Sequence, residues 1–269
     1  MNSSSQKAMA FIEVLFIFSL VVIIYRALLT TSLNVWENRI FDRNFLEYLI
    51  IAAIPLVFLI IKRKKFSEYG ISTGNVKYQL DIVTICAIPI IVLSISLFIL
   101  DWKHWEGALI VSSIEIVLLY IIAWSLRKKP AAGNVNTSCM SVFLMSGILL
   151  SGSASLIGNI ALTFIFFFVF VGPAEEILFR GYIQSRLNEV FGRPYCFFGV
   201  NWGMGLIIAS LIFGLWHVLN PFNPFLGKFD LAWQWGLWTF FAGLIFGFIR
   251  EKTGNITAPA ILHGLLNFL

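Results

Sequence analysis

The sequence predicts an all-α protein: a polytopic integral membrane helix bundle of about seven to eight transmembrane helices with an intramembrane polar cavity. Hydrophobic residues make up 59% of the 269 residues and charged residues only 12%, whereas charged residues make up about 25% of soluble domains. Apolar runs of about 20 residues, the length that crosses a bilayer, recur along the chain. Polar clusters interrupt three of the later runs, and such side chains usually face the bundle interior.

Each apolar run gives one expected span. The first run is too long for the core of a signal peptide, so we expect an uncleaved first span. The run 139–171 would extend about 50 Å as one helix, and its small residues 151–155 offer a break between two segments. In order, eight expected spans are 9–29, 46–61, 80–100, 108–126, the two parts of 139–171, 203–219 and 231–249, and a short final stretch, 256–269, follows them.

The chain shows no internal repeat, low-complexity tract or linker, so residues 1–269 are expected to form a single integral membrane domain. Within it, residues 1–138 are N-terminal spans without a motif. Residues 155–269 carry all three polar clusters and form the expected catalytic core.

The net charge of +5 indicates orientation rather than nucleic-acid binding, because the cations bracket the hydrophobic runs. Cation-rich loops lie on the cytoplasmic side of a membrane, so we expect a multi-pass protein of the cell membrane with these loops inside. The cation-rich loops hold Lys62 to Lys65, Lys77, Arg127, Lys128, Lys129, Arg180, Arg186, Arg193, Arg250 and Lys252, and the alternate loops hold only Arg39, Arg43, Lys103 and Lys228.

The first polar cluster is Glu175-Glu176 with Arg180. Glu176 and Arg180 are four residues apart with the glutamate first, the favoured orientation for an ion pair on a helix. Glu175 is rotated by about 100° around the helix axis and is left free for another task. Pro173 removes a helical hydrogen bond just before the pair and favours a kink. Alone, this motif is more typical of glutamates solvated at the membrane interface beside Arg180 and Arg186.

The other two clusters pair Phe213 with His217 and His263 with Asn267, each four residues apart and therefore on one helix face. If the helix bearing Glu175 continues to about residue 190, Glu175 and His217 lie at similar depths on antiparallel neighbours. His263 lies nearer the start of its own segment, which suggests a bent or re-entrant end. A carboxylate and two histidines on three spans favour hydrolytic chemistry.

The stretch Glu175-Glu176-Ile177-Leu178-Phe179-Arg180-Gly181, the Phe213-x-x-x-His217 step and the terminal His263-x-x-x-Asn267 pair resemble the CAAX protease and bacteriocin-processing enzyme family, also called the abortive-infection family. All three motifs follow the family's order. The resemblance implies an intramembrane endopeptidase that hydrolyses a peptide bond of a membrane-associated or lipidated substrate.

Carried over residue by residue, the resemblance implies that Glu175 is the general base that activates a water with His217. It implies that His263 and Asn267 stabilise the oxyanion. No cofactor is expected, although Glu175, His217 and His263 are acceptable zinc ligands. The supporting residues implied are Glu176, Arg180 and Phe213, the last packing beside His217.

Two other functions fit the composition. A non-enzymatic membrane scaffold or bacteriocin-immunity protein of the same fold would show degenerate catalytic positions, and none of the four is degenerate. A transporter using buried carboxylates often carries internal repeats, and none is found. The expected partners are a peptide or lipidated protein substrate and membrane lipids, with no nucleic acid. Because the polar stretch 184–188 continues its helix toward water, we expect the active site to open to the cytoplasm.

Overall fold

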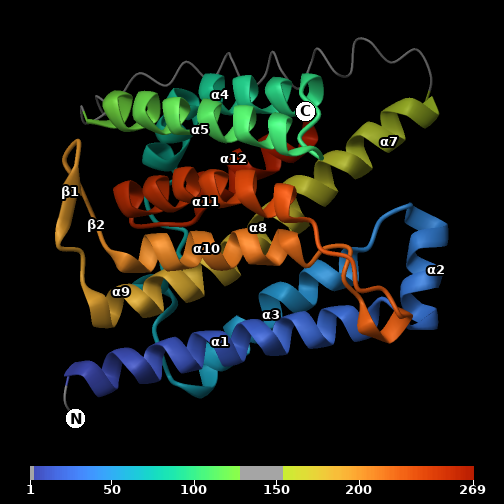
Figure 1. Ribbon diagram of the computed structural model, residues 1–269, viewed down its shortest axis with the longest axis horizontal. Helices are drawn as coiled ribbons and strands as arrows, with labels where there is room; N and C mark the ends of the chain where they lie inside the picture. The colour runs from blue at the N-terminus through green and yellow to red at the C-terminus, as the bar shows by residue number, and fades with distance from the viewer. Residues whose placement is uncertain (1–2, 128–153) are drawn as a thin grey trace.

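The computed structural model describes residues 3–127 and 154–269, and nearly every element in them is helical (Figure 1). The predicted all-α class is confirmed. The exceptions among these residues are two short strands, which pair antiparallel as a hairpin. In chain order the elements are α1 (Ser3–Leu28), α2 (Ser32–Phe41), α3 (Phe45–Ile61), η1 (Phe66–Tyr69), α4 (Val76–Ile99), α5 (Trp105–Leu126), α7 (Ala154–Ile165), η2 (Phe166–Val171), α8 (Gly172–Glu176), η3 (Ile177–Gln184), α9 (Ser185–Phe191), β1 (Tyr195–Phe197), β2 (Val200–Trp202), α10 (Met204–Val218), η4 (Pro224–Leu226), α11 (Trp233–Thr253) and α12 (Thr257–Phe268).

The helices pack in layers around two hydrophobic cores (Figure 1). Helices α1 and α3 form one outer layer, α9 and α10 the next, α11 and α12 the third, and α4 with α5 the other outer layer. One core lies among α4, α5, α11 and α12. The second lies among α1, α3, α10 and the segment from α8 to α9. Polar groups on the middle layers are therefore covered from both sides.

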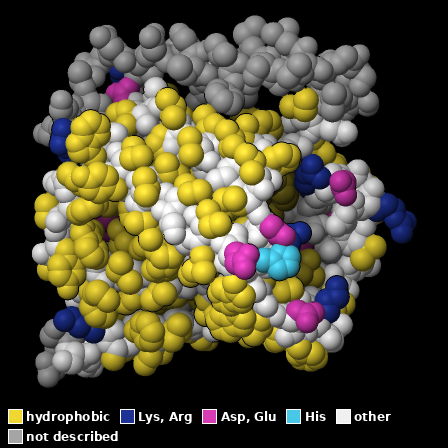
Figure 2. Space-filling view, turned by 45° about the horizontal axis from the view of Figure 1, so that its top comes forward, with side chains coloured by type: hydrophobic (Ala, Val, Ile, Leu, Met, Phe, Trp, Pro, Cys, Tyr) yellow, Lys and Arg dark blue, Asp and Glu magenta, His cyan; other side chains and the backbone are white. Residues whose placement is uncertain are grey.

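Four helices of the described residues are long and apolar enough to cross a membrane: Ser4–Leu28, Val76–Ile99, Trp105–Leu126 and Gly158–Phe191. Helices α3 and α10 are apolar but shorter. The predicted count of seven to eight spans is therefore not confirmed, and the span expected in the first part of 139–171 lies outside the described residues. Hydrophobic side chains cover much of the face in Figure 2, with most charged side chains at its edges and on one side, as expected of a helical membrane protein.

The bundle has two ends. The α2 end consists of α2 and residues 29–44, 100–104 and 219–232, and lies at the right of Figure 1. The hairpin end consists of the β1–β2 hairpin and residues 62–75 and 254–256. The lysines of residues 62–65 lie at the hairpin end, whereas Lys103 and Lys228 lie at the α2 end.

Helix α2 had no counterpart among the predicted elements because its sequence mixes polar and apolar residues. The Thr31 hydroxyl caps its first turn by accepting the Asn34 amide hydrogen. The Glu37 carboxylate then accepts hydrogen bonds from the Phe45 and Leu46 amides, at 3.0 and 3.1 Å. Because these are free donors at the start of α3, Glu37 fixes where that helix begins.

Candidate active site

Glu175 and Glu176 lie in a helical rod that changes type along its length. Segments η2 and η3 are π-helical, and α8 between them is a single short α-helical stretch. Pro173, in the first turn of α8, has no amide hydrogen to donate and interrupts regular helical bonding there. Short π-helical segments concentrate at functional sites. The two glutamates therefore lie where the helix changes between π-helical and α-helical hydrogen bonding.

Two glycines allow α8 and α12 to approach closely. A Cβ added to Gly172 would lie 2.6 Å from the Ala260 carbonyl oxygen and 3.1 Å from the Gly264 nitrogen. A Cβ added to Gly264 would lie 3.0 Å from the Phe167 carbonyl oxygen. No side chain fits between the two backbones, and this contact brings His263 of α12 against the glutamates of α8.

We expect Gly172→Ala to separate the two helices and to lower both the melting temperature and any turnover. Overpacking of this kind costs about 1–3 kcal/mol. Gly158→Ala, in α7 of the same rod, is the matched control because a Cβ there meets nothing within 4 Å, and alanine favours the helix over glycine. Thermal unfolding of both variants in detergent checks this; a Gly172→Ala melting temperature equal to that of wild type would contradict the close packing.

One carboxylate oxygen of Glu176 binds residues of both the first and the third motif. Its Oε1 accepts a hydrogen bond from Arg180 at 2.8 Å and another from Nδ1 of His263 at 2.9 Å. The ion pair predicted between Glu176 and Arg180 is confirmed. Glu175, Glu176 and Arg180 are only 4%, 0% and 1% exposed, so the alternative of glutamates solvated at the interface is wrong.

Arg180 is held on several sides. A second guanidinium nitrogen donates to the Gly243 carbonyl of α11 at 3.2 Å. The guanidinium carbon lies 4.4 Å from the centre of the Phe213 ring and 5.5 Å from that of Phe246. Stacking on aromatic rings suits a guanidinium, which is weakly hydrated and planar. Arg180 therefore ties α10 and α11 to the glutamate helix.

The two histidines face the glutamates with defined nitrogen atoms. His217 Nδ1 lies 2.9 Å from the Phe213 carbonyl oxygen; because a carbonyl only accepts, Nδ1 donates and Nε2 remains an acceptor. His263 Nδ1 likewise donates to Glu176, and its Nε2 lies 3.7 Å from Glu175 Oε2. Phe213 contacts both imidazoles edge to face, as predicted for its packing beside His217.

All four residues predicted to be catalytic line a single cavity of about 770 Å³. Glu175 Oε2 is buried there with no hydrogen-bond partner. Asn267, on the last turn of α12, is exposed at the cavity wall. The lining also includes residues of the N-terminal spans, which the sequence had placed outside the catalytic core: Tyr25, Asn38, Asp42, Arg43, Asn44, Glu47, Tyr48, Trp102 and Lys103.

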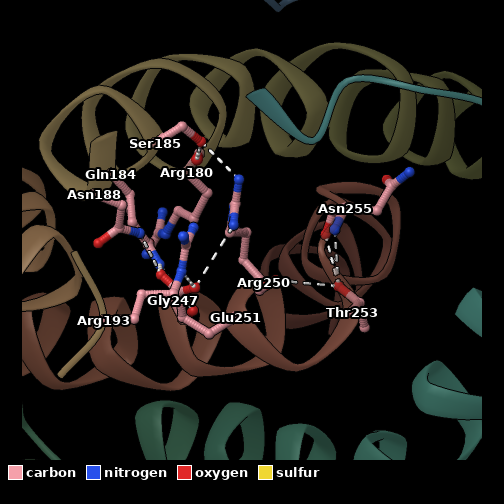
Figure 3. Close-up of polar contacts among 10 residues, drawn as sticks. All are labelled: Arg180, Gln184, Ser185, Asn188, Arg193, Gly247, Arg250, Glu251, Thr253 and Asn255. Atoms are coloured by element: carbon pink, nitrogen blue, oxygen red, sulfur yellow. Dashed lines mark hydrogen bonds and ion pairs between the residues drawn. The ribbon is translucent and has the colours of Figure 1, made fainter. Parts of the chain in front are cut away.

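The cavity reaches the α2 end of the bundle, since its lining includes Lys103 and Pro221 of the loops there. The water route predicted along residues 184–188 is wrong. Gln184 and Asn188 are buried, and both donate hydrogen bonds to the Glu251 carboxylate of α11, on which Arg193 also converges (Figure 3). The amide nitrogens of both side chains thus bind a neighbouring helix rather than lead toward water.

The three candidate zinc ligands are Glu175, His217 and His263. In the described parts of the chain, no group of three or more His, Cys, Asp or Glu side chains is arranged to hold a metal ion. Nδ1 of each histidine donates to a protein acceptor, which leaves Nε2 of each ring free to act as an acceptor or a ligand. The proposed chemistry is derived from the side chains alone.

Fold and site together define a helical membrane protein with a buried glutamate–histidine centre. Residues 157–269 match the family model Rce1-like, described as Type II CAAX prenyl endopeptidase Rce1-like. This segment contains all three motifs, so the resemblance predicted to the CAAX protease family is confirmed, and it indicates an endopeptidase of the CAAX-protease type. No curated protein and no solved structure matches the chain.

Proposed function

We propose that this chain is an intramembrane endopeptidase that hydrolyses a peptide bond of a membrane-associated or lipidated protein. The observation that carries the proposal is the position of Glu175: a buried carboxylate oxygen without a hydrogen-bond partner, in a cavity that His217, His263 and Asn267 also line. A buried unpaired acceptor is costly, and a bound water would satisfy it.

In this mechanism Glu175 Oε2 takes a proton from that water while the water oxygen attacks the scissile carbonyl carbon. His217 Nε2, the free acceptor of the imidazole, accepts the other water hydrogen and fixes the direction of attack. When the carbon–nitrogen bond breaks, Glu175 returns the proton to the leaving amine. The steps consume one water and use no metal ion or other cofactor.

The negative charge on the carbonyl oxygen is stabilised by Asn267 and His263. Because Nδ1 of His263 donates to Glu176, Nε2 donates to an oxyanion only when the imidazole is doubly protonated. The Glu176 carboxylate stabilises that imidazolium and fixes its orientation, as the aspartate does in serine protease triads. Glu176 is thus a positioning residue for His263 as well as the partner of Arg180.

Cleavage of lipidated and membrane-anchored peptides, read by mass spectrometry, tests this function. Asn267→Ala is expected to lower kcat/KM by about 10²–10³-fold, the usual effect of losing one oxyanion donor. The loss should appear in kcat, because the donor acts on charge that develops only in the transition state. Near-unchanged turnover would remove Asn267 from the mechanism.

We further propose that the protein is a multi-pass protein of the cell membrane, with the cation-rich hairpin end in the cytoplasm. The cavity, which reaches the α2 end, then opens to the outside. Cysteines replacing exposed Ser67 at the hairpin end and exposed Asp230 at the α2 end test this in a background without native cysteines. An impermeant thiol reagent should label Asp230→Cys in intact cells and Ser67→Cys only after permeabilisation. The reverse pattern would place the opening in the cytoplasm.

A further inference from the structure

Glu47 is a buried carboxylate that the mechanism above does not use. It lies in the first turn of α3, a helix that is otherwise entirely uncharged, and is only 3% exposed. An ionisable side chain buried in a membrane-spanning segment is expensive and usually has a function. Glu47 lies outside the family-matched residues 157–269, so no motif accounts for it.

Glu37, a second buried carboxylate nearby, shows what a purely structural role looks like. Its carboxylate is fully engaged by the backbone amides of Phe45 and Leu46 at the start of α3. The Glu47 carboxylate interacts with neutral side chains instead: the Asn34 amide donates to Oε1 at 2.8 Å, and Tyr25 is a second partner. Asn34 is buried in α2, so this bond fixes the direction of the carboxylate without neutralising it.

No cation of the described residues lies within ion-pair distance of Glu47. Arg26 on α1 donates instead to the carbonyl oxygens of Leu219 and Asn220, at 2.7 and 3.1 Å. Arg43, which lines the cavity, is held by Asp42. The Glu47 carboxylate is therefore oriented by its neighbours and has no direct ion-pair partner among the described residues, although the charge of Arg26 acts on it from a longer distance.

Glu47 lines the same cavity as Glu175, on the wall formed by α1, α2 and α3. Tyr25 also lines this wall and interacts with the Glu47 carboxylate. Arg43 and Asp42 of the same lining pair with each other, whereas a carboxylate without an ion-pair partner attracts ligand groups of the opposite charge. A chain that reaches Glu175 from the α2 end therefore enters a cavity that this carboxylate also lines.

We propose that Glu47 is a substrate-binding residue that takes a positively charged group, the protonated amine or guanidinium of a basic side chain near the scissile bond. Its assignment to a peptide side chain rests on the proposed peptidase function. The cation site itself does not, and it can be tested without turnover.

The test uses the full chain without native cysteines and with Asn44→Cys as a reporter, because Asn44 lines the cavity and its Oδ1 has no hydrogen-bond partner. The rates of modification by cationic trimethylammonium-ethyl and anionic sulfonatoethyl methanethiosulfonate are each divided by the rate for a free thiol. We expect the cationic reagent to be favoured by about tenfold. Glu47→Gln should abolish this preference, Glu47→Asp should keep it, and Glu37→Gln is the matched control that should also keep it.

An unchanged preference in Glu47→Gln would overturn the cation site. A second measurement identifies the chemical group that supplies the cation: peptides are tested for their ability to slow labelling of Asn44→Cys. This measurement needs no Glu47 variant. An N-acetylated peptide amide with one lysine should slow the labelling, and the same peptide with norleucine should not. A third peptide carries norleucine and a free amino terminus. If only this peptide slows labelling, the cation site is supported, but its ligand is an α-amine rather than a basic side chain. Equal behaviour of all three peptides would overturn the proposal, whether or not the protein cleaves them.

Discussion

Glu175→Gln should lower turnover by about 10⁴-fold, at the upper end of the range for general acid–base catalysis, while leaving the protein folded. Both proton transfers of the proposed reaction pass through this carboxylate, and the amide cannot perform either. The substitution keeps the side-chain volume and removes a buried oxygen that has no partner, so little packing is lost. Product formation by mass spectrometry, with melting temperature measured in parallel, checks both parts.

Glu115→Gln is the matched control. Glu115 is 1% exposed in α5, both of its oxygens lack hydrogen-bond partners, and it does not line the cavity. This variant loses the same charge and keeps the same volume in another span, so it should cleave at the wild-type rate. Wild-type cleavage by Glu175→Gln would show that the base has been assigned to the wrong residue, and equal losses in both variants would point to a general effect of removing a buried carboxyl.

Arg180→Ala should destabilise the protein by about 3–5 kcal/mol, because it leaves the buried Glu176 carboxylate without its cation. The substitution also removes the bond to the Gly243 carbonyl and the stacking on Phe213. Arg186 pairs with Glu13 and Glu189 in a partly exposed setting, where ion pairs contribute about 0–1 kcal/mol. Arg186→Ala should therefore cost much less.

Melting temperature and detergent-extracted yield of the two variants measure this difference. Arg180→Lys should fall between wild type and Arg180→Ala, since it keeps the charge and loses the planar, multiply bonded guanidinium. Melting temperatures that are equal for Arg180→Ala and Arg186→Ala would show that the Glu176 pair is not the buried support inferred from its geometry.

Much of the secondary structure follows from the hydrophobic pattern. The runs expected at 46–61, 203–219 and 256–269 are the helices Phe45–Ile61, Met204–Val218 and Thr257–Phe268, with ends shifted by a residue or two. Each is an apolar run bounded by polar residues, which a linear reading can find. Helix α2 was missed because its polar and apolar residues are mixed and its ends are fixed by a cap and by hydrogen bonds to the start of α3.

The Glu176–Arg180 pair was predictable because four residues is one helical turn. The bond from His263 to Glu176 joins residues 87 positions apart in the sequence, and no periodicity relates them. It exists because Gly172 and Gly264 let α8 and α12 meet. The sequence could name these residues, but their relative positions depend on helix packing.

The membrane class, most helix positions, the i,i+4 ion pair and the motif residues were predictable without coordinates, because each depends on composition or on spacing within one helix. Helix packing, in contrast, places the amide nitrogens of Gln184 and Asn188 on Glu251, brings the cavity to the α2 end and makes Glu47 part of its lining. A polar side chain has the same sequence signature whether water or another helix satisfies it. Which of the two occurs depends on the neighbours that the fold supplies.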